Sequence, residues 1–176
     1  MNKKLIVINL FSGPGAGKTS SCSQIFSYLK WNNVNCEQIS EYAKKLTWRK
    51  NHKQLKNQLY VFSKQYNDIY MVEDEVDVVV TDSPLLLSVI YDAEKDEDLR
   101  RYIIKKHNKY ENINIFIKRV KPYHKVGRSQ TESESREIDS AVFSLLTELE
   151  ESYEIINGTY EDMLKLSQDL VIKLKK

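Results

Sequence analysis

The sequence is poor in the residues that build disulfide frameworks, flexible linkers and low-complexity tracts. Its 176 residues include two cysteines, five glycines and three prolines, and no internal repeat is present. Two cysteines are too few for a disulfide-rich secreted scaffold, and they favour a reducing compartment. Because Cys22 and Cys36 do not have the spacing of metal ligands, we interpret both as small packing residues.

An excess of charge of one sign is also missing. The chain carries 27 Lys and Arg residues against 25 Asp and Glu residues, which gives a net charge of +2 at pH 7. This balance disfavours a protein whose main role is to bind nucleic acid, because such proteins usually show a concentrated basic face. A balanced net charge is still compatible with a local basic groove.

Long hydrophobic runs are absent. No stretch approaches the roughly 18 consecutive apolar residues that a membrane span needs. The opening, MNKKLIVINLF, has a charged start, but its apolar run is too short for a secretory signal, so we expect a cytoplasmic protein with no membrane partner. The length suits one domain with a proper core, and we predict a single domain over residues 1–176.

Apolar residues alternate between strand and helix periodicity along the whole chain. We predict strands over residues 5–11, 34–39, 76–81, 113–117 and 153–156. We predict helices from residue 18, from residue 41 with Ser40 as N-cap, over 51–73, from the pair Ser83-Pro84, over 99–108, from the capping box of Thr131 and Glu134, and from Thr159. This alternation predicts an α/β domain with a parallel sheet and helices on both faces.

The turn after the first predicted strand reads SGPGAGKTS, residues 12–20. It matches the phosphate-binding pattern G-x-x-x-x-G-K-[ST], except that Ser12 takes the first glycine position and Gly13 follows one residue late. Glycines let backbone N–H groups close on a phosphate, while Lys18 adds charge and Thr19 offers a hydroxyl to Mg²⁺. A glycine turn without a ligand is the alternative, but the strand before it and the helix after it favour a nucleotide site. The predicted nucleotide-binding residues are Gly13, Pro14, Gly15, Ala16, Gly17, Lys18, Thr19 and Ser20, with Arg119 added.

Two other classes of P-loop protein fit poorly. A GTPase should carry N-K-x-D after a strand, whereas residues 108–111, NKYE, precede one, and Asp82 is followed by Ser-Pro-Leu rather than a switch glycine. A motor ATPase usually needs a longer chain and an acidic pair at the end of the third strand. This sequence has only Asp82 there.

Two carboxylates follow predicted strands at the edge of the sheet where a ligand binds. Asp82 ends the valine-rich strand, so we predict that it holds Mg²⁺ together with Thr19; the alternative is that it caps the next helix. Glu41 follows the second strand and could accept the proton of an acceptor hydroxyl. An acidic residue also simply favours a helix N-terminus, and position alone does not decide between these roles.

A basic, irregular segment over about residues 119–136 precedes the Thr131 helix. We predict that it is a lid whose Arg128 and Arg136 supply charge to a transferring phosphoryl group. Arg136 lies near a helix N-terminus, where a cation is disfavoured. The simpler compensation is a surface ion pair between Arg136 and Glu132, four residues earlier.

Four stretches in this order, FSGPGAGKTS, SEYAKKLTW, VVVTDSPLLLSVIYD and GRSQTESESREID, resemble the P-loop nucleoside kinases. The likeness is to the ribosylnicotinamide-kinase-like and deoxyribonucleoside-kinase-like branch, which is often phage-encoded. It covers residues 4 to about 140 and implies a three-layer fold with strand order 2-3-1-4-5, ATP and Mg²⁺ as cofactors, and a location in the host cytoplasm if a phage carries the gene. The roles it implies are Glu41 as general base, Asp82 at the metal, and Arg128 in the lid with Arg136 as a second candidate there; Lys18, from the motif itself, is the predicted catalytic cation at the phosphates.

The acceptor is the least determined part of the prediction. The sequence departs from the resemblance at Lys44 and Lys45, where relatives tend to carry an arginine. Gln54, Gln58 and Gln65 could recognise an amide or a nucleobase edge, but we favour the alternative that they form a solvated helix face. We expect Trp48 to be the aromatic residue nearest a substrate ring.

Three functions remain open from the sequence. The first is a kinase of a small nucleoside- or nucleotide-like acceptor, and the second is a kinase of hydroxymethylated pyrimidine bases in DNA. The third is a nucleotide-binding regulator without turnover. The second would use a phosphate-backbone groove made of Lys44, Lys45, Arg49, Lys50, Lys53 and Lys56.

Overall fold

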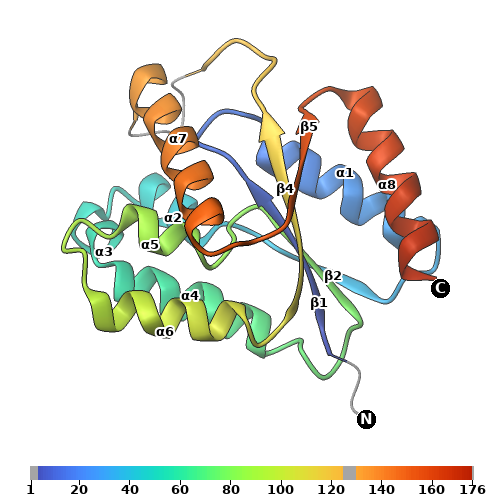
Figure 1. The fold of residues 1–176 in the computed structure, drawn as a ribbon, viewed down its shortest axis with the longest axis horizontal. Coiled ribbons are helices and arrows are strands. Elements are labelled where there is room, and N and C mark those ends of the chain that lie inside the picture. The colour runs from blue at the N-terminus through green and yellow to red at the C-terminus, as the bar shows by residue number, and fades with distance from the viewer. Residues whose placement is uncertain (1–3, 125–129, 176) are drawn as a thin grey trace.

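A five-stranded sheet forms the centre of the computed structural model, which describes residues 4–124 and 130–175 (Figure 1). Its strands are β1 (Ile6–Phe11), β2 (Cys36–Ile39), β3 (Val78–Thr81), β4 (Glu111–Lys118) and β5 (Tyr153–Asn157). All neighbouring strands are parallel, and they lie in the order β2-β3-β1-β4-β5. The predicted fold class and strand order are confirmed.

Helices cover both faces of the sheet, so the molecule has three layers (Figure 1). The helices are α1 (Lys18–Trp31), α2 (Tyr42–Trp48), α3 (His52–Lys56), α4 (Gln58–Tyr70), α5 (Leu87–Tyr91), α6 (Glu97–His107), α7 (Glu132–Glu148) and α8 (Tyr160–Leu174). Helices α1 and α8 pack on one face, and α4, α5, α6 and α7 lie on the other.

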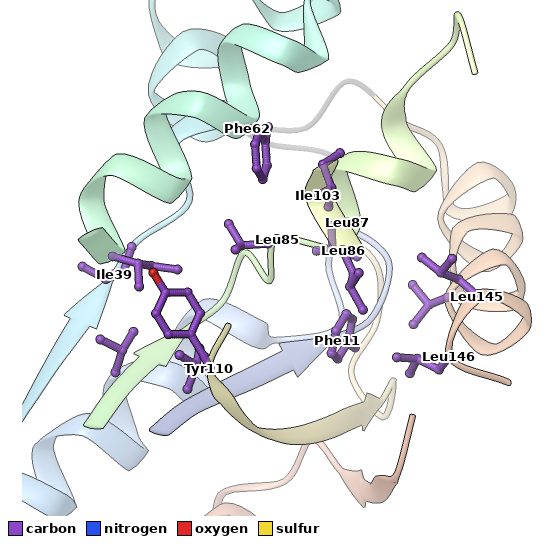
Figure 2. Close-up of a cluster of buried hydrophobic side chains, with 14 of the residues drawn as sticks. Phe11, Ile39, Phe62, Leu85, Leu86, Leu87, Ile103, Tyr110, Leu145 and Leu146 are labelled. Carbon is purple, nitrogen blue, oxygen red and sulfur yellow. The ribbon is translucent and has the colours of Figure 1, made fainter. Parts of the chain in front are cut away.

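Two apolar clusters hold the layers together, one on each side of the sheet. On the α1–α8 side, alternate residues of the central strand such as Ile8 and Leu10 pack against Ile25 and Leu29. Figure 2 shows the cluster on the opposite side, where side chains such as Phe62 of α4 and Leu145 of α7 converge on the sheet. Burial on both faces explains why the inner strands β1 and β3 read as continuous apolar runs rather than alternating ones.

The prediction of one helix over residues 51–73 is wrong, because the chain breaks at Asn57. Its backbone is extended there (φ −82°, ψ 92°), and its side chain accepts a hydrogen bond from the Tyr60 N–H. Asparagine is a strong N-cap, so Asn57 ends α3 and starts α4 in place of continuing a helix.

Two helix starts also differ from the predictions. The N-cap of α2 is Glu41 rather than Ser40, and the N-cap side chain makes no capping hydrogen bond. Pro84 does not open a helix; its carbonyl accepts the N–H of Leu87 in a turn, and α5 begins at Leu87. By contrast, the predicted capping box of Thr131 and Glu134 is confirmed at the start of α7.

Two expectations drawn from composition can be compared with the structure. Cys22 and Cys36 are free thiols with no exposed surface, as packing residues should be. Within residues 4–124 and 130–175, no helix has the length and apolar character needed to cross a bilayer.

Candidate nucleotide-binding site

The predicted phosphate loop lies at the carboxyl edge of the sheet, between β1 and α1 (Figure 1). Sheet register brings the ends of three strands together there, because Thr81 of β3 pairs with Asn9 of β1 on one side and Ile39 of β2 on the other. The residues that follow β2 and β3 therefore emerge beside the loop. The backbone N–H of Glu41 donates to Asp82 Oδ1 over 3.0 Å, which joins the two predicted carboxylate residues directly.

The conformation of the loop explains two of its glycines. Gly15 and Gly17 have φ angles of 81° and 103°, in the left-handed region that residues with a Cβ rarely adopt. Gly17 is also the N-cap of α1, so the first N–H groups of that helix have no helical partner. Within the part of the chain that the structure describes, the N–H groups of residues 15–20 make no hydrogen bond, and this is the arrangement that receives an anion.

Lys18 sits inside the loop with its ammonium group among acidic neighbours. Its Nζ donates to the carbonyl oxygens of Ser12 at 2.7 Å and Gly13 at 3.2 Å. Burial lowers the pKa of Lys18, while the nearby carboxylates of Glu41, Asp82 and Asp139 act in the opposite direction. Ser12 contributes a backbone carbonyl, which any residue could supply, so its departure from the motif leaves this contact intact.

Asp82 is a buried carboxylate with an unsatisfied oxygen. Only 1% of the residue is exposed, Oδ1 is bonded to the Glu41 N–H, and Oδ2 has no partner among the described residues. A buried charged oxygen without a donor is costly, and a cation would satisfy it. No group of three or more His, Cys, Asp or Glu side chains clusters around a metal position in the described chain. Mg²⁺ commonly binds through one or two protein oxygens plus phosphate, so Asp82 and the exposed hydroxyl of Thr19 fit that donor set.

Tyr91, the last residue of α5, was not anticipated from the sequence. Burial raises the pKa of its phenol, and the charges of Glu41 and Asp139 add to the effect. The phenol therefore lies within electrostatic range of the predicted base and of Asp139. Only the placement of α5 reveals this, since nothing in the local sequence distinguishes Tyr91 from a core aromatic.

The predicted arginines occupy different environments. Arg119 lies against the loop, but its Nη1 donates to the Pro14 carbonyl at 2.8 Å and its Nη2 donates to Ser135 Oγ at 2.5 Å. Arg136 is exposed and pairs with Glu132 at 2.8 Å, the simpler of the two alternatives. Arg128 lies outside the described residues, so the lid remains a prediction.

The expected solvated glutamine face is wrong at two of its three positions. Gln58 and Gln65 are 8% and 2% exposed, and only Gln54 faces solvent. Gln65 Oε1 accepts the Tyr42 N–H at 3.1 Å, so this side chain ties the start of α2 to the inner face of α4. Trp48 is 62% exposed at the end of α2.

A cavity of about 420 Å³ adjoins the loop at Gly17. It lies between α1, up to Ser27, and the first turn of α8, and its lining includes Gly17, Ser20, Lys121, Thr159 and Tyr160. The β5–α8 turn reaches the loop closely, because a Cβ on Gly158 would lie 3.0 Å from the carbonyl oxygen of Ala16. A cavity of this size suits the base and ribose of a nucleotide whose phosphates lie in the loop.

A comparison with protein-family models supports a P-loop domain. A family model described as an AAA domain matches residues 7–162, a range that includes the phosphate loop, Glu41, Asp82 and all of α7. A crystal structure described as that of APE1195 aligns with a TM-score of 0.48 and 14% identity, over 98% of this chain and 96% of that one. No curated protein matches. The finer resemblance to nucleoside kinases thus stays a prediction.

Proposed function

The chain belongs to the AAA domain family, and from this premise we propose that it is an ATP-dependent kinase that phosphorylates a hydroxyl of a nucleoside- or nucleotide-like acceptor. One observation carries the proposal. The candidate base Glu41 donates its N–H to the candidate metal ligand Asp82, and both carboxylates act on the ammonium group of Lys18. Candidates for the phosphate-binding lysine, the metal ligand and the proton acceptor thus lie at one edge of the sheet, which supports the proposal.

The donor half of the site would bind the triphosphate through backbone and charge. The N–H groups of residues 15–20, which make no hydrogen bond to the described residues, and the positive end of the α1 dipole would face the phosphates, and Lys18 would add a full charge. Asp82 and Thr19 would hold Mg²⁺, which when bound neutralises charge on the phosphate oxygens. The cavity beside Gly17 and Tyr160 would take the nucleoside part of ATP.

The acceptor half would be built around Glu41. Its carboxylate takes the proton of the acceptor hydroxyl as that oxygen bonds to the γ-phosphorus. The bond from the γ-phosphorus to the bridging oxygen breaks, and ADP leaves with that oxygen. Tyr91, whose phenol is affected by the charge of Glu41, would be a candidate to orient the acceptor hydroxyl.

Replacement of the base tests the proposal. We expect Glu41→Gln to abolish phosphoryl transfer and to leave ATP binding within about twofold of the wild-type protein. Glu154→Gln, an exposed substitution on β5, is the matched control and should change neither quantity. Transfer should be screened against nucleosides, nucleotides, ribosylnicotinamide and DNA that contains hydroxymethyluracil. Full transfer by Glu41→Gln overturns the base assignment, and ATP binding without transfer to any acceptor favours a non-catalytic regulator.

A second candidate, an acceptor within DNA, is favoured by a basic surface on α2 and α3. Residues 42–67 contain no Asp or Glu. The surface is exposed and makes no ion pair within the described residues; it consists of Lys44, Lys45, Arg49, Lys50, Lys53 and Lys56. Such a surface suits a phosphate backbone, although a run of this kind is often only solvated.

Duplex binding separates the two candidates. If DNA is the acceptor, a gel shift should weaken steeply with salt and should be lost when Lys53 and Lys56 are both changed to alanine. The paired change of Lys165 and Lys173, exposed lysines of α8, is the control. A chain that phosphorylates a free nucleoside and shows no salt-dependent shift is a small-molecule kinase.

A further inference from the structure

Helix α7 forms hydrogen bonds with the backbone of the phosphate loop. Asp139 Oδ1 accepts the backbone N–H of Gly13 at 2.5 Å, and Asp139 Oδ2 pairs with Arg119 Nη2 at 3.2 Å. Hydrogen bonds to a charged acceptor are about twice as strong as neutral ones. The side chain of Asp139 is only 21% exposed, so this contact is partly protected from water.

Pro14, the next residue of the loop, accepts hydrogen bonds from the same side. The carbonyl oxygen of Pro14 accepts from Ser135 Oγ at 2.6 Å and from Arg119 Nη1 at 2.8 Å. Ser135 itself has no exposed surface. Since proline lacks an N–H and the Gly13 carbonyl accepts from Lys18, every backbone polar group of Gly13 and Pro14 has a partner.

The close approach of α7 also explains why a glycine follows Ser12. A Cβ on Gly13 would lie 2.2 Å from the carbonyl oxygen of Ser135 and 3.0 Å from Asp139 Oδ1. A side chain at this position would therefore push α7 away from the loop. The close packing of α7 thus requires glycine at position 13. The phosphate-binding pattern alone does not include this requirement.

We propose that Asp139 is a positioning residue of the phosphate site, which fixes the first turn of the loop through Gly13 and couples α7 to the bound nucleotide. With Gly13 and Pro14 fixed, the N–H groups of residues 15–20 are preorganised for phosphate. The inference rests on the proposed function only in that the loop binds ATP. It adds Asp139 to that site, and it implies that the loop and α7 each affect the other when nucleotide binds.

Arg119 acts within this arrangement rather than as a free cation. Both Nη atoms are bonded inside the protein, and its Nε is buried without a partner in the described structure. Its guanidinium thus bridges Pro14, Ser135 and Asp139. The predicted contact between Arg119 and nucleotide remains a prediction beside this structural role.

Calorimetric titration with Mg²⁺-ATP tests the inference without knowledge of the acceptor. We expect Asp139→Ala to raise the Kd about tenfold or more, as the loss of a charge-assisted hydrogen bond would. Asp139→Asn keeps an acceptor for the Gly13 N–H but loses the charge that faces Arg119, so its Kd should lie between those of Asp139→Ala and the wild type. Glu137→Gln, exposed on the same helix, should stay within about twofold.

Hydrogen exchange separates a positioning role from a merely structural one. In the wild-type protein, Mg²⁺-ATP should slow exchange over residues 132–142 of α7 as well as at the start of α1. In Asp139→Ala, the slowing at α7 should disappear and that at α1 should remain at saturating ATP. Wild-type Kd and undiminished α7 protection in that variant would overturn the inference.

Two further results distinguish the possible failures. A wild-type chain that does not bind ATP refutes the proposed function itself. If Asp139→Ala does not fold, the nearly isosteric Asp139→Asn decides by the same two measurements, with unchanged Kd and unchanged α7 protection counting against the inference.

Discussion

At the scale of single residues, Asp82 shows a conflict between stability and binding. Its buried Oδ2 has no partner among the described residues, and its Oδ1 accepts the Glu41 N–H. A buried, half-satisfied carboxylate costs the fold free energy that a neutral amide would not. Functional sites commonly retain such groups because the ligand satisfies them.

We therefore expect Asp82→Asn to leave the melting temperature equal or higher while weakening Mg²⁺-ATP binding about tenfold. The asparagine Oδ1 can still accept the Glu41 N–H, so the local fold is kept. In the presence of EDTA, the Kd for ATP should be nearly the same in Asp82→Asn and the wild type, because the substitution removes only the contact with the metal. Thermal unfolding and calorimetric titration measure the two effects. A clear fall in melting temperature, or full Mg²⁺-dependent binding, contradicts this role.

Other residues of the site differ in how far the sequence could reveal them. Lys18, Thr19, Glu41 and Asp82 follow strands or a glycine turn, so local pattern and chain order indicate them. Asp139 approaches Gly13 across 126 positions of the chain. No local pattern encodes that contact, because it depends on how α7 crosses the sheet.

At the scale of elements, the break between α3 and α4 shows a cap outweighing helix propensity. Residues around Asn57 suit a continuous helix by periodicity, yet the asparagine side chain binds the Tyr60 N–H and takes an extended backbone. Competition of this kind between a short polar side chain and the backbone ends many helices. The sequence therefore predicts that this region is helical, but it does not predict that the helix is interrupted at Asn57.

Removal of this cap should be measurable in the stability of the whole domain. We expect Asn57→Ala to lower the free energy of unfolding by about 1 kcal/mol, a typical loss for an N-cap. Asn57→Asp, which can accept the same hydrogen bond, should retain most of the stability, and Lys53→Ala on exposed α3 is the control. Urea unfolding with an unchanged m-value measures the difference. Equal stability of the alanine and aspartate variants would count against the capping role.

At the scale of the whole molecule, a buried polar network links the two halves of the sheet. Asn9 of β1 donates to Asn112 and Asn114 of β4, and Asn114 donates to Glu151. Glu151 Oε1 lies 3.2 Å from Nε2 of His107, which is 1% exposed at the end of α6. Burial lowers the pKa of His107, and Glu151 opposes that effect.

The sign of the pH dependence follows from this lowered pKa. The folded protein favours the neutral imidazole, so the unfolded chain binds the proton more readily as the pH falls below the ordinary pKa of histidine. We expect the free energy of unfolding to decrease from pH 7 to pH 5.5, and to decrease less in His107→Asn. Urea unfolding at both pH values measures this. A wild-type protein that gains stability relative to His107→Asn at the lower pH would show that Glu151 dominates.

The sheet itself illustrates what chain order can and cannot provide. Alternating strand and helix patterns predict parallel strands with helices on both faces, because crossovers require that arrangement. The order β2-β3-β1-β4-β5 came only from the resemblance to known kinases, and the structure has it. The cavity between α1 and α8 follows from that order and could not be read from either helix alone.

The destination of the γ-phosphoryl group tests the central claim most directly. The wild-type protein should be incubated with γ-labelled ATP, Mg²⁺ and the acceptor panel, and the products separated into free phosphate and labelled acceptor. The account predicts label on the hydroxyl of a nucleoside- or nucleotide-like acceptor, with one ADP formed for each labelled product. Release of the label only as inorganic phosphate would contradict it, and would mark the site as that of an ATPase.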